Sequence, residues 1–243
     1  MQAYAQDRHQ VRFEWGVRGV HAVANGADVI VVVDVLSFST AVDVAVSRGA
    51  RVFPFRYKDE RARAFADKVG ATLAVDRQSA SLENPFSLSP RSLLSLRVGK
   101  NLVLPSPNGA AVVLESARLC PCVITACARN AAAVARAIRD AGWTTIAVVA
   151  AGEQWEDKSL RPALEDLWGA GAVLSELRDL ALSPEAQAAG ACFWDLDPNT
   201  VQGCSSAQEL LATGFEDDVV MALELNSSSC VPMLEDGAFG DAS

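Results

Sequence analysis

The chain has 243 residues, half of them hydrophobic, and its 21 Lys and Arg against 30 Asp and Glu give a formal net charge of −9. This size and composition fit one large α/β domain or two small ones. The negative charge argues against nucleic acid or an anionic membrane surface as a partner, but it permits a small phosphorylated substrate held by a few local donors.

The sequence shows neither a recognisable targeting signal nor a C-x-x-C pair. No apolar stretch approaches the roughly 18 residues of a transmembrane helix, and the polar N-terminus MQAYAQDRHQ has no signal-peptide core, so we expect a cytoplasmic protein. The six cysteines form no C-x-x-C pair and have only His9 and His21 for company, which predicts reduced thiols rather than a zinc site. A homodimer is the default expectation for assembly.

The first half of the chain alternates strand-like and helix-like segments. Residues 28–35, DVIVVVDV, form a continuous apolar run of the kind found in strands covered on both faces. A second strand, 51–55, contains Pro54, which has no backbone N–H and predicts a position near a sheet edge. Residues 77–98 lack any period and predict a long functional or mobile loop. Two helices, 39–50 and 58–70, and a strand at 71–76 complete this half.

The second half continues the alternation. Leucines 160, 164, 167, 174 and 177 share one face with Gly171, which predicts a helix from Ser159 onward. Ser206 and Glu209 form a potential capping box, and VVMALELN at 219–226 resembles a final strand. The other predicted strands are 101–106, 121–128 and 144–153, and the other predicted helices are 108–118 and 129–142.

This order predicts a layered α/β/α fold with a mostly parallel or mixed sheet. We expect a single domain over 1–243, and the less regular composition after about residue 180 leaves room for a smaller lobe.

Polar residues gather where four of the predicted strands end. Asp34 ends the first strand, Asp76-Arg77 the third, Ser106-Pro107-Asn108-Gly109 follows the fourth and Glu153 ends the sixth. Ligands of open α/β sheets bind at the carboxyl ends of the strands. If these strands are parallel, the four ends meet along one rim.

Two of these junctions open a helix. Asp34 either caps that helix or faces a cation or free amides, because a carboxylate beside a buried strand needs such a partner. The hydroxyls of Ser37, Ser39 and Thr40 either cap the helix or hold a phosphate. Ser106, Asn108 and Gly109 form either an ordinary tight turn or an anion site, since glycine lets backbone amides approach an oxyanion closely.

A third group lies near Pro162, which suits the first turn of a helix. Glu165 and Asp166 there either complement the helix dipole or bind a hard cation such as Mg²⁺, which takes few carboxylates plus water and substrate oxygens. Arg161 is placed to contact a phosphate or another anionic group.

Five segments, in this order, resemble the 2-phosphosulfolactate phosphatase family over most of the chain. They are VVVDVLSFSTAV, LPSPNGAAV, ARNAAAVA, AGEQWEDKSLRPALEDLWGAGAVL and ELNSSSCVPMLEDG. The resemblance implies a Mg²⁺-dependent phosphatase associated with coenzyme M biosynthesis. Asp34 matches the acid of the family's D-V-L motif, Asn108-Gly109 its N-G turn, and Glu165-Asp166 its E-D pair; the SSSCVP segment matches without an assigned role.

The chain departs from the family pattern at two places. Ser37 stands where the family commonly has arginine, and Asp76-Arg77-Gln78-Ser79 stands where it commonly has E-R-G-G, so that Arg77 is retained. A lost cation would weaken binding of a sulfonate or carboxylate, because charged hydrogen bonds contribute about 1.5–3 kcal/mol each. The resemblance therefore implies the family more firmly than the substrate.

We therefore predict a phosphatase for 2-phosphosulfolactate or a related small phospho-acid, with Mg²⁺ as cofactor. Asp34, Arg77 and Arg161 would be catalytic, with Asp34 a nucleophile or a metal ligand. The metal ligands would be Asp34, Glu165 and Asp166, and the substrate ligands Ser37, Ser39, Thr40, Ser106, Asn108 and Gly109.

Two other readings remain open. The departures at Ser37 and Gln78-Ser79 also fit an anion-binding protein without catalysis. A haloacid-dehalogenase phosphatase would need a second Asp two residues after Asp34, where this chain has Leu36.

Overall fold

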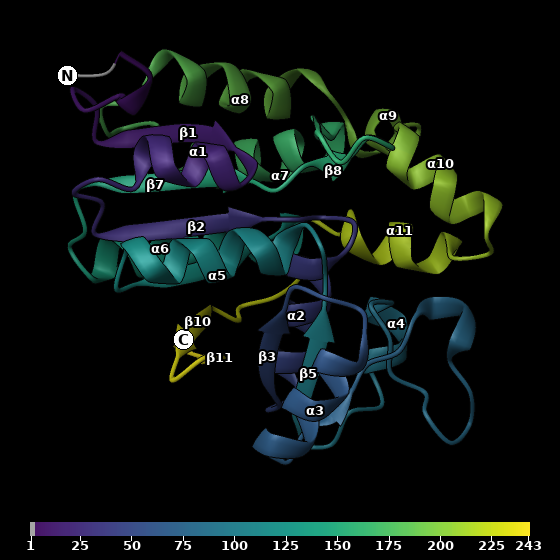
Figure 1. Ribbon diagram of the computed structural model, residues 1–243. Coiled ribbons are helices and arrows are strands. Elements are labelled where there is room, and N and C mark those ends of the chain that lie inside the picture. Colours follow the sequence, from purple (N-terminus) through teal and green to yellow (C-terminus); the bar gives the residue numbers. More distant parts are fainter. Residues whose placement is uncertain (1–2) are drawn as a thin grey trace.

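The computed structural model describes residues 3–243 as a layered α/β protein built on a nine-stranded mixed sheet (Figure 1). The predicted fold class is confirmed. The strand order is β1-β7-β2-β6-β10-β11-β3-β5-β4, and a separate hairpin pairs β8 with β9. The strands are β1 Val11–Trp15, β2 Val29–Val33, β3 Arg51–Phe55, β4 Thr72–Leu73, β5 Asn101–Pro105, β6 Val123–Ala126, β7 Ile146–Ala150, β8 Glu153–Gln154, β9 Leu160–Arg161, β10 Pro232–Glu235 and β11 Ala238–Asp241.

The sheet consists of two parallel units joined by an antiparallel hairpin. Strands β1, β7, β2 and β6 run parallel to one another, as do β3, β5 and β4. The C-terminal hairpin β10-β11 pairs antiparallel with β6 on one side and with β3 on the other. In Figure 1, β2 lies nearly horizontal while β5 points up toward the end of β2. The two units are therefore turned so that their carboxyl ends face each other.

Helices cover the sheet on both sides. They are α1 Gly16–Val23, α2 Phe38–Ser47, α3 Glu60–Val69, α4 Pro90–Leu93, α5 Gly109–Leu119, α6 Ala131–Asp140, α7 Leu164–Glu176, α8 Pro184–Asp195, α9 Pro198–Gln202, α10 Ser205–Ala212 and α11 Glu216–Ala222. Short 3₁₀ turns occupy Ala3–Ala5, Arg77–Ser79 and Ala128–Asn130. None of the helices within residues 3–243 has the length and apolar character needed to cross a membrane.

Strand β2 explains why the first apolar run is buried on both faces. Val29, Val31 and Val33 pack into a core with α6 and α7. The alternate residues Ile30 and Val32 pack into a second core with α1, α2 and α5. Because strand side chains alternate between faces, a strand between two helix layers must be apolar throughout.

Most predicted elements are confirmed, and the polar loop at 77–98 contains only the 3₁₀ turn and α4. Strand β1 and helices α1 and α8 were not predicted. All six cysteines are free thiols, as expected. The residues after about 180 supply α8 to α11 and also β10 and β11 of the main sheet. That residues 1–243 form a single domain stays a prediction.

The predicted strand at 219–226 is wrong, because Glu216–Ala222 form helix α11. A short apolar run does not distinguish a buried strand from a buried helix. Three acids in the first turn, Glu216, Asp217 and Asp218, favour the helix through its dipole.

Three further expectations are corrected. Helix α10 begins at Ser205, so Ser206 lies inside its first turn, and no capping box forms with Glu209. Helix α7 begins at Leu164 rather than near Ser159, because Leu160 and Arg161 pair in β9. Pro54 is not at a sheet edge: β3 lies between β11 and β5, but β11 meets it only at Val52, so the missing N–H interrupts no pairing on that side.

The SSSCVP segment now has a structural role. Asp43, fully buried in α2, accepts hydrogen bonds from Ser228 Oγ at 2.6 Å and from Arg129 Nε at 3.0 Å. Asn130 Nδ2 donates to the carbonyl of Cys230 at 3.2 Å. These contacts fasten the chain leading into β10 to α2 and to the 3₁₀ turn after β6.

We predict that Arg129→Met lowers the free energy of unfolding by about 3 kcal/mol, because it leaves the Asp43 carboxylate buried without its cation. Urea denaturation measures the change. Arg136→Met, at an exposed position of α6, is the matched control and should cost less than about 0.5 kcal/mol. Equal effects of the two substitutions would contradict the role given to Arg129.

Candidate functional site

Asp34 lies where the two parallel units of the sheet meet. Its carboxylate is buried and accepts the Phe38 N–H at 3.0 Å through Oδ1 and the Gly109 N–H at 2.9 Å through Oδ2. Phe38 and Gly109 are the first residues of α2 and α5. One carboxylate therefore caps two helices, and the positive ends of both dipoles face it.

Gly109 is required for this arrangement. A Cβ added at position 109 would lie 2.5 Å from Asp34 Oδ2 and 2.6 Å from the Phe38 ring. The glycine of the N-G turn thus permits the close approach of α5 to Asp34.

Asp166 forms a second carboxylate clamp from the first turn of α7. Its Oδ1 accepts the Val35 N–H at 2.7 Å, and its Oδ2 accepts the Gly152 N–H at 2.8 Å. Asp166 therefore holds together the loops that follow β2 and β7. Its neighbour Glu165 is also buried and accepts the Cys204 thiol at 3.1 Å.

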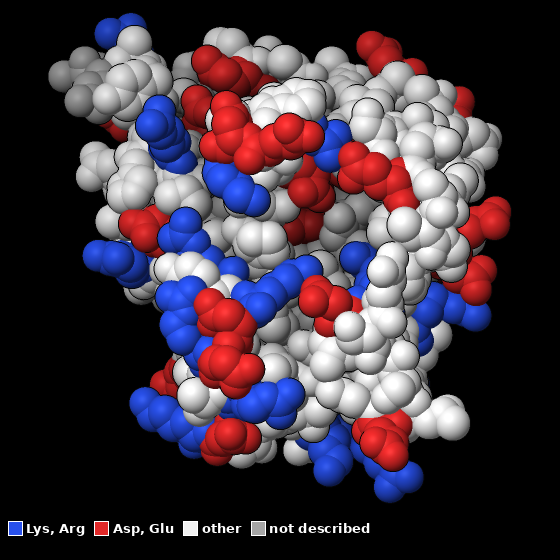
Figure 2. All heavy atoms as spheres, turned by 45° about the vertical axis from the view of Figure 1, so that its right-hand side comes forward, with Lys and Arg blue, Asp and Glu red and all other residues white. Residues whose placement is uncertain are grey.

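Glu153 brings a fourth carboxyl group to this site. It follows β7, lines the large cavity beside the site, and accepts a hydrogen bond from Asn108 Nδ2 at 2.6 Å. The cavity has a volume of about 780 Å³ and is also lined by residues of the β3–α3 segment, the 77–79 turn, α10 and Phe215. Figure 2 shows this face hollowed near its centre, with acidic side chains along the upper wall and basic ones below.

Burial raises the pKa values of three carboxyl groups at the site, those of Asp34, Glu153 and Asp166. Burial, and then repulsion by Asp34 and Glu165, raises the pKa of Glu153 to about 8. Burial raises the pKa of Asp34 to about 6 against the two backbone hydrogen bonds, which lower it. Burial and the charges of Asp34 and Glu165 also raise the pKa of Asp166. The folded protein thus concentrates negative charge that a cation would relieve.

Arg77 lines the cavity, and its positive charge acts to lower the pKa of Asp34. Its guanidinium contacts Ser37 Oγ, lies 3.3 Å from Asp218 Oδ2, and stacks over the Phe215 ring at 5.6 Å. Asp218 is itself buried and held by Ser89 Oγ at 2.6 Å. Ser89 of the 77–98 loop and Asp218 of α11 therefore hold the Arg77 guanidinium beside Ser37, in the loop after Asp34.

Arg161 comes from the β8-β9 hairpin. Its Nη2 is 3.4 Å from Glu209 Oε1, and its guanidinium lies 5.7 Å from the centre of the Trp155 ring. Its charge partly offsets the rise in the pKa of Glu153. The structure thus brings Asp34, Arg77, Arg161, Glu165 and Asp166 into one region, and their roles stay predictions.

The other predicted substrate ligands lie differently. Ser39 Oγ accepts the Asp34 N–H at 2.9 Å and contacts Thr125 Oγ1, and Thr40 Oγ1 donates to the Val35 carbonyl at 2.8 Å. Both hydroxyls are thus engaged inside the fold. Ser106 is buried, and its backbone N–H donates to the Phe55 carbonyl. Substrate contact by these three residues stays a prediction.

Sequence reasoning left two residues out of the predicted site. Glu153 was recognised as a strand end, and its place beside Asn108 supplies the reason to include it. Asp218 directly precedes residues 219–226, which the sequence predicts as a strand. No feature of the sequence links Asp218 to Arg77.

The donor set fits a hard divalent cation. Mg²⁺ takes oxygen ligands, needs only one or two carboxylates, and completes its shell with water and substrate phosphates. Within residues 3–243, no three acidic, His or Cys side chains already converge as ligands on one point. The oxygens of Asp34 and Asp166 accept backbone N–H groups, whereas Glu153 lines the cavity. These carboxylates therefore do not point at a common centre.

Comparison with known proteins matches most of the chain to one family. Residues 18–237 match the family model described as 2-phosphosulpholactate phosphatase. The chain is 33% identical over 214 residues to a probable 2-phosphosulfolactate phosphatase of Gloeobacter violaceus, covering 84% of this chain and 87% of the relative. It is 29% identical over 214 residues to the 2-phosphosulfolactate phosphatase of Methanothermobacter thermautotrophicus, covering 87% and 89%, respectively. A probable 2-phosphosulfolactate phosphatase of Thermotoga maritima is 30% identical over 217 residues, covering 86% and 90%.

We predict that Gly109→Ala destabilises the protein by about 1–3 kcal/mol, because the added methyl group forces α5 away from Asp34. Gly190→Ala is the matched control: it lies in α8 with open space around its Cβ and should leave stability unchanged or raised. Thermal and urea unfolding measure both. A Gly109→Ala protein as stable as the unmodified one would refute the close approach.

We predict that Glu153→Gln gains stability relative to the unmodified, metal-free protein as pH rises. Unfolded, Glu153 titrates near its ordinary pKa of 4.5, but folded it keeps its proton to about pH 8. Between these values the unfolded chain loses a proton that the folded protein retains, so the free energy of unfolding falls as pH rises. The glutamine side chain does not titrate, so this fall in the free energy of unfolding is absent from the variant.

Urea unfolding in a chelator, at several pH values between about 4.5 and 8, tests this difference. Glu156→Gln, an exposed position in the same hairpin, is the control and should not alter the pH dependence. A gain for Glu153→Gln that stays constant across pH would contradict the burial-induced shift.

Proposed function

The chain belongs to the 2-phosphosulpholactate phosphatase family, and we propose that it is a Mg²⁺-dependent phosphatase acting on 2-phosphosulfolactate or a related small phospho-acid. The observation that carries this proposal is the meeting of Asp34, Glu153, Glu165 and Asp166 beside a cavity that Arg77 also lines. Phosphomonoester hydrolysis needs charge neutralisation of the phosphoryl oxygens and a fixed position for the attacking group, and this set of residues can supply both.

In the proposed site, Asp34, Glu165 and Asp166 would hold Mg²⁺, and Glu153 would offer a further oxygen from the cavity side. When bound, Mg²⁺ neutralises phosphoryl oxygens and polarises the phosphorus for attack. Asp34 keeps a fixed orientation because both of its oxygens accept backbone hydrogen bonds. This orientation would suit Asp34 either as a metal ligand or as a nucleophile.

Arg77 is proposed to hold charge that develops on the phosphoryl oxygens. Its position is set by Asp218, so its guanidinium needs little reorganisation when the substrate binds. Arg161 is proposed to hold anionic charge as well. Its charge already acts on Glu153. Asn108 orients Glu153 and reaches the site from the start of α5.

We predict that the protein releases inorganic phosphate from 2-phosphosulfolactate only when Mg²⁺ is present, and that a chelator abolishes the release. Asp34→Asn should lower kcat by at least about a hundredfold, because the amide keeps the shape of the carboxylate but not its charge. Asp157→Asn is the matched control, since this exposed acid bonds only within its own hairpin.

Phosphate release that survives both the chelator and Asp34→Asn would refute the proposed mechanism. Saturable binding of 2-phosphosulfolactate without any phosphate release would instead identify an anion-binding protein on this fold.

A further inference from the structure

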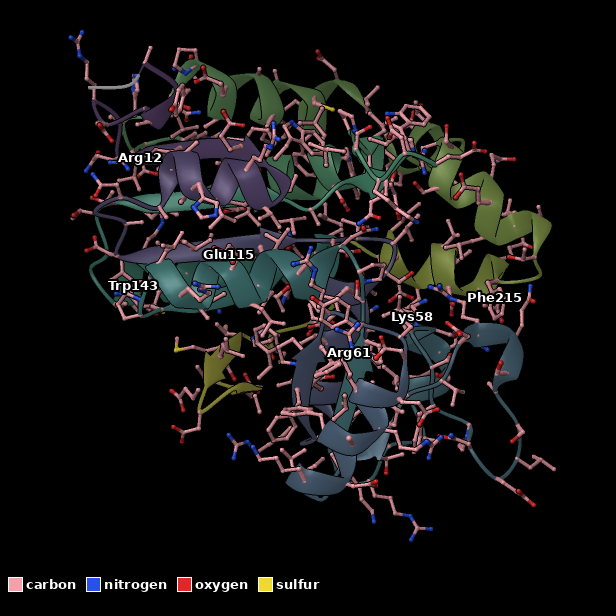
Figure 3. The ribbon with its side chains drawn as sticks, viewed as in Figure 1. Arg12, Lys58, Arg61, Glu115, Trp143 and Phe215 are labelled. Carbon is pink, nitrogen blue, oxygen red and sulfur yellow. The ribbon has the colours of Figure 1, made fainter. Side chains whose placement is uncertain are left out.

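The part of the cavity lining near α3 and the 77–79 turn is mixed in charge, with acids at Asp59, Glu60 and Asp76. Three basic residues line the cavity: Lys58, Arg63 and Arg77. Figure 2 shows basic side chains gathered along the lower side of the hollow. In the view of Figure 3, Lys58 lies toward α11 and Phe215, another residue of the cavity lining.

Two of these cations already have carboxylate partners. Arg77 is paired with the buried Asp218 at 3.3 Å. Lys58 Nζ lies 2.9 Å from Asp76 Oδ1. Arg63 forms no salt bridge with any residue in the part of the chain that the structure describes, although Glu60 stands one helical turn before it. Arg63 is therefore the cavity cation left available to a ligand.

The fold holds Arg63 at the rim of the cavity. Helix α3 buries Ala62 and Ala66, which fixes its orientation and leaves Arg63 exposed beside the buried face. A guanidinium presents several donors in a planar fork and suits carboxylate, sulfonate or phosphate oxygens.

The cavity is larger than a phosphoryl group, so a ligand bound in it can extend as far as Arg63. A volume of about 780 Å³ exceeds what a phosphoryl group alone fills. With the phosphoryl group at the carboxylate wall, as proposed above, the rest of the ligand extends toward α3. An acidic group at that end would meet a cation that has no other partner.

We propose that Arg63 binds the second acidic group of the substrate, a carboxylate or sulfonate, and thereby selects phospho-acids over phosphomonoesters that carry no second charge. This inference rests on the proposed phosphatase function for the placement of the phosphoryl group.

The test compares Arg63→Gln with Arg61→Gln, a matched change two residues earlier on α3. Arg61 pairs with Asp59 at 2.6 Å, stacks over Tyr57 at 3.6 Å, and does not belong to the cavity lining within residues 3–243. Figure 3 shows Arg61 on the side of Lys58 away from Phe215.

Steady-state kinetics are measured with 2-phosphosulfolactate and with p-nitrophenyl phosphate, which has no second acidic group. Arg63→Gln should raise KM for 2-phosphosulfolactate about tenfold with kcat unchanged, as expected for one lost charge-assisted contact. Its constants for p-nitrophenyl phosphate should not change, and Arg61→Gln should change neither substrate.

Calorimetry with sulfolactate, which keeps both acidic groups but lacks the phosphoryl group, gives a readout independent of turnover. Arg63→Gln should raise the Kd of sulfolactate about tenfold and Arg61→Gln should leave it unchanged. Failure to hydrolyse any phosphoester would refute the proposed function, while this comparison would still decide the role of Arg63.

Three results would overturn the role of Arg63. They are an equal loss on both phosphoesters, the same loss in Arg61→Gln, and sulfolactate binding that is absent or unaffected by Arg63→Gln.

Discussion

The site depends on one carboxylate shared between two helices. Asp34 accepts the first N–H of α2 and the first N–H of α5, which follow strands of the two different parallel units. Burial opposes its charge while the two helix N-termini favour it, and a pKa raised to about 6 is the balance of these effects. Removing either helix start would leave one oxygen of the buried carboxylate without its backbone donor, so the same group fixes the sheet geometry and the chemistry of the site.

Asp166 repeats this design on the other side of Asp34. By binding the Val35 and Gly152 amides, it ties α7 to the loops after β2 and β7. The fold thus uses two carboxylates as clamps and adds Glu153 and Glu165 next to them. Each clamp stabilises the chain locally, but burial, and then the charges of Asp34 and Glu165, raise the pKa of Glu153. Such a conflict between local stability and charge is typical of functional sites.

The sequence indicated that Asp34, Asn108 and the acids of α7 gather, but it indicated neither Asp218 nor the way in which the elements meet. The rule that ligands bind at strand ends selected Asp34, Asn108 and the acids of α7, and the structure brings them together. The rule applies to strands that run parallel in one sheet, whereas β2 and β5 belong to two parallel units separated by the hairpin β10-β11. That hairpin comes from the end of the chain, and its long-range pairing leaves no local signal. The same holds for Asp218, which reaches Arg77 across 141 residues of sequence.

The charge distribution also explains how an acidic protein can suit an anionic substrate. The net charge of −9 and the carboxylate wall would both repel a phosphoester. Under the proposed function, the phosphoryl group can approach that wall only after its charge has been neutralised, so a bound cation becomes a condition for substrate binding as well as for turnover. Under the role proposed for Arg63, the side of the cavity near α3 has the opposite property, because this arginine would attract an acid without any added cation. On these two proposals the sides of the cavity would have separate tasks: one would admit the phosphoryl group only with a cation, and the other would recognise the group to which the phosphoryl is attached.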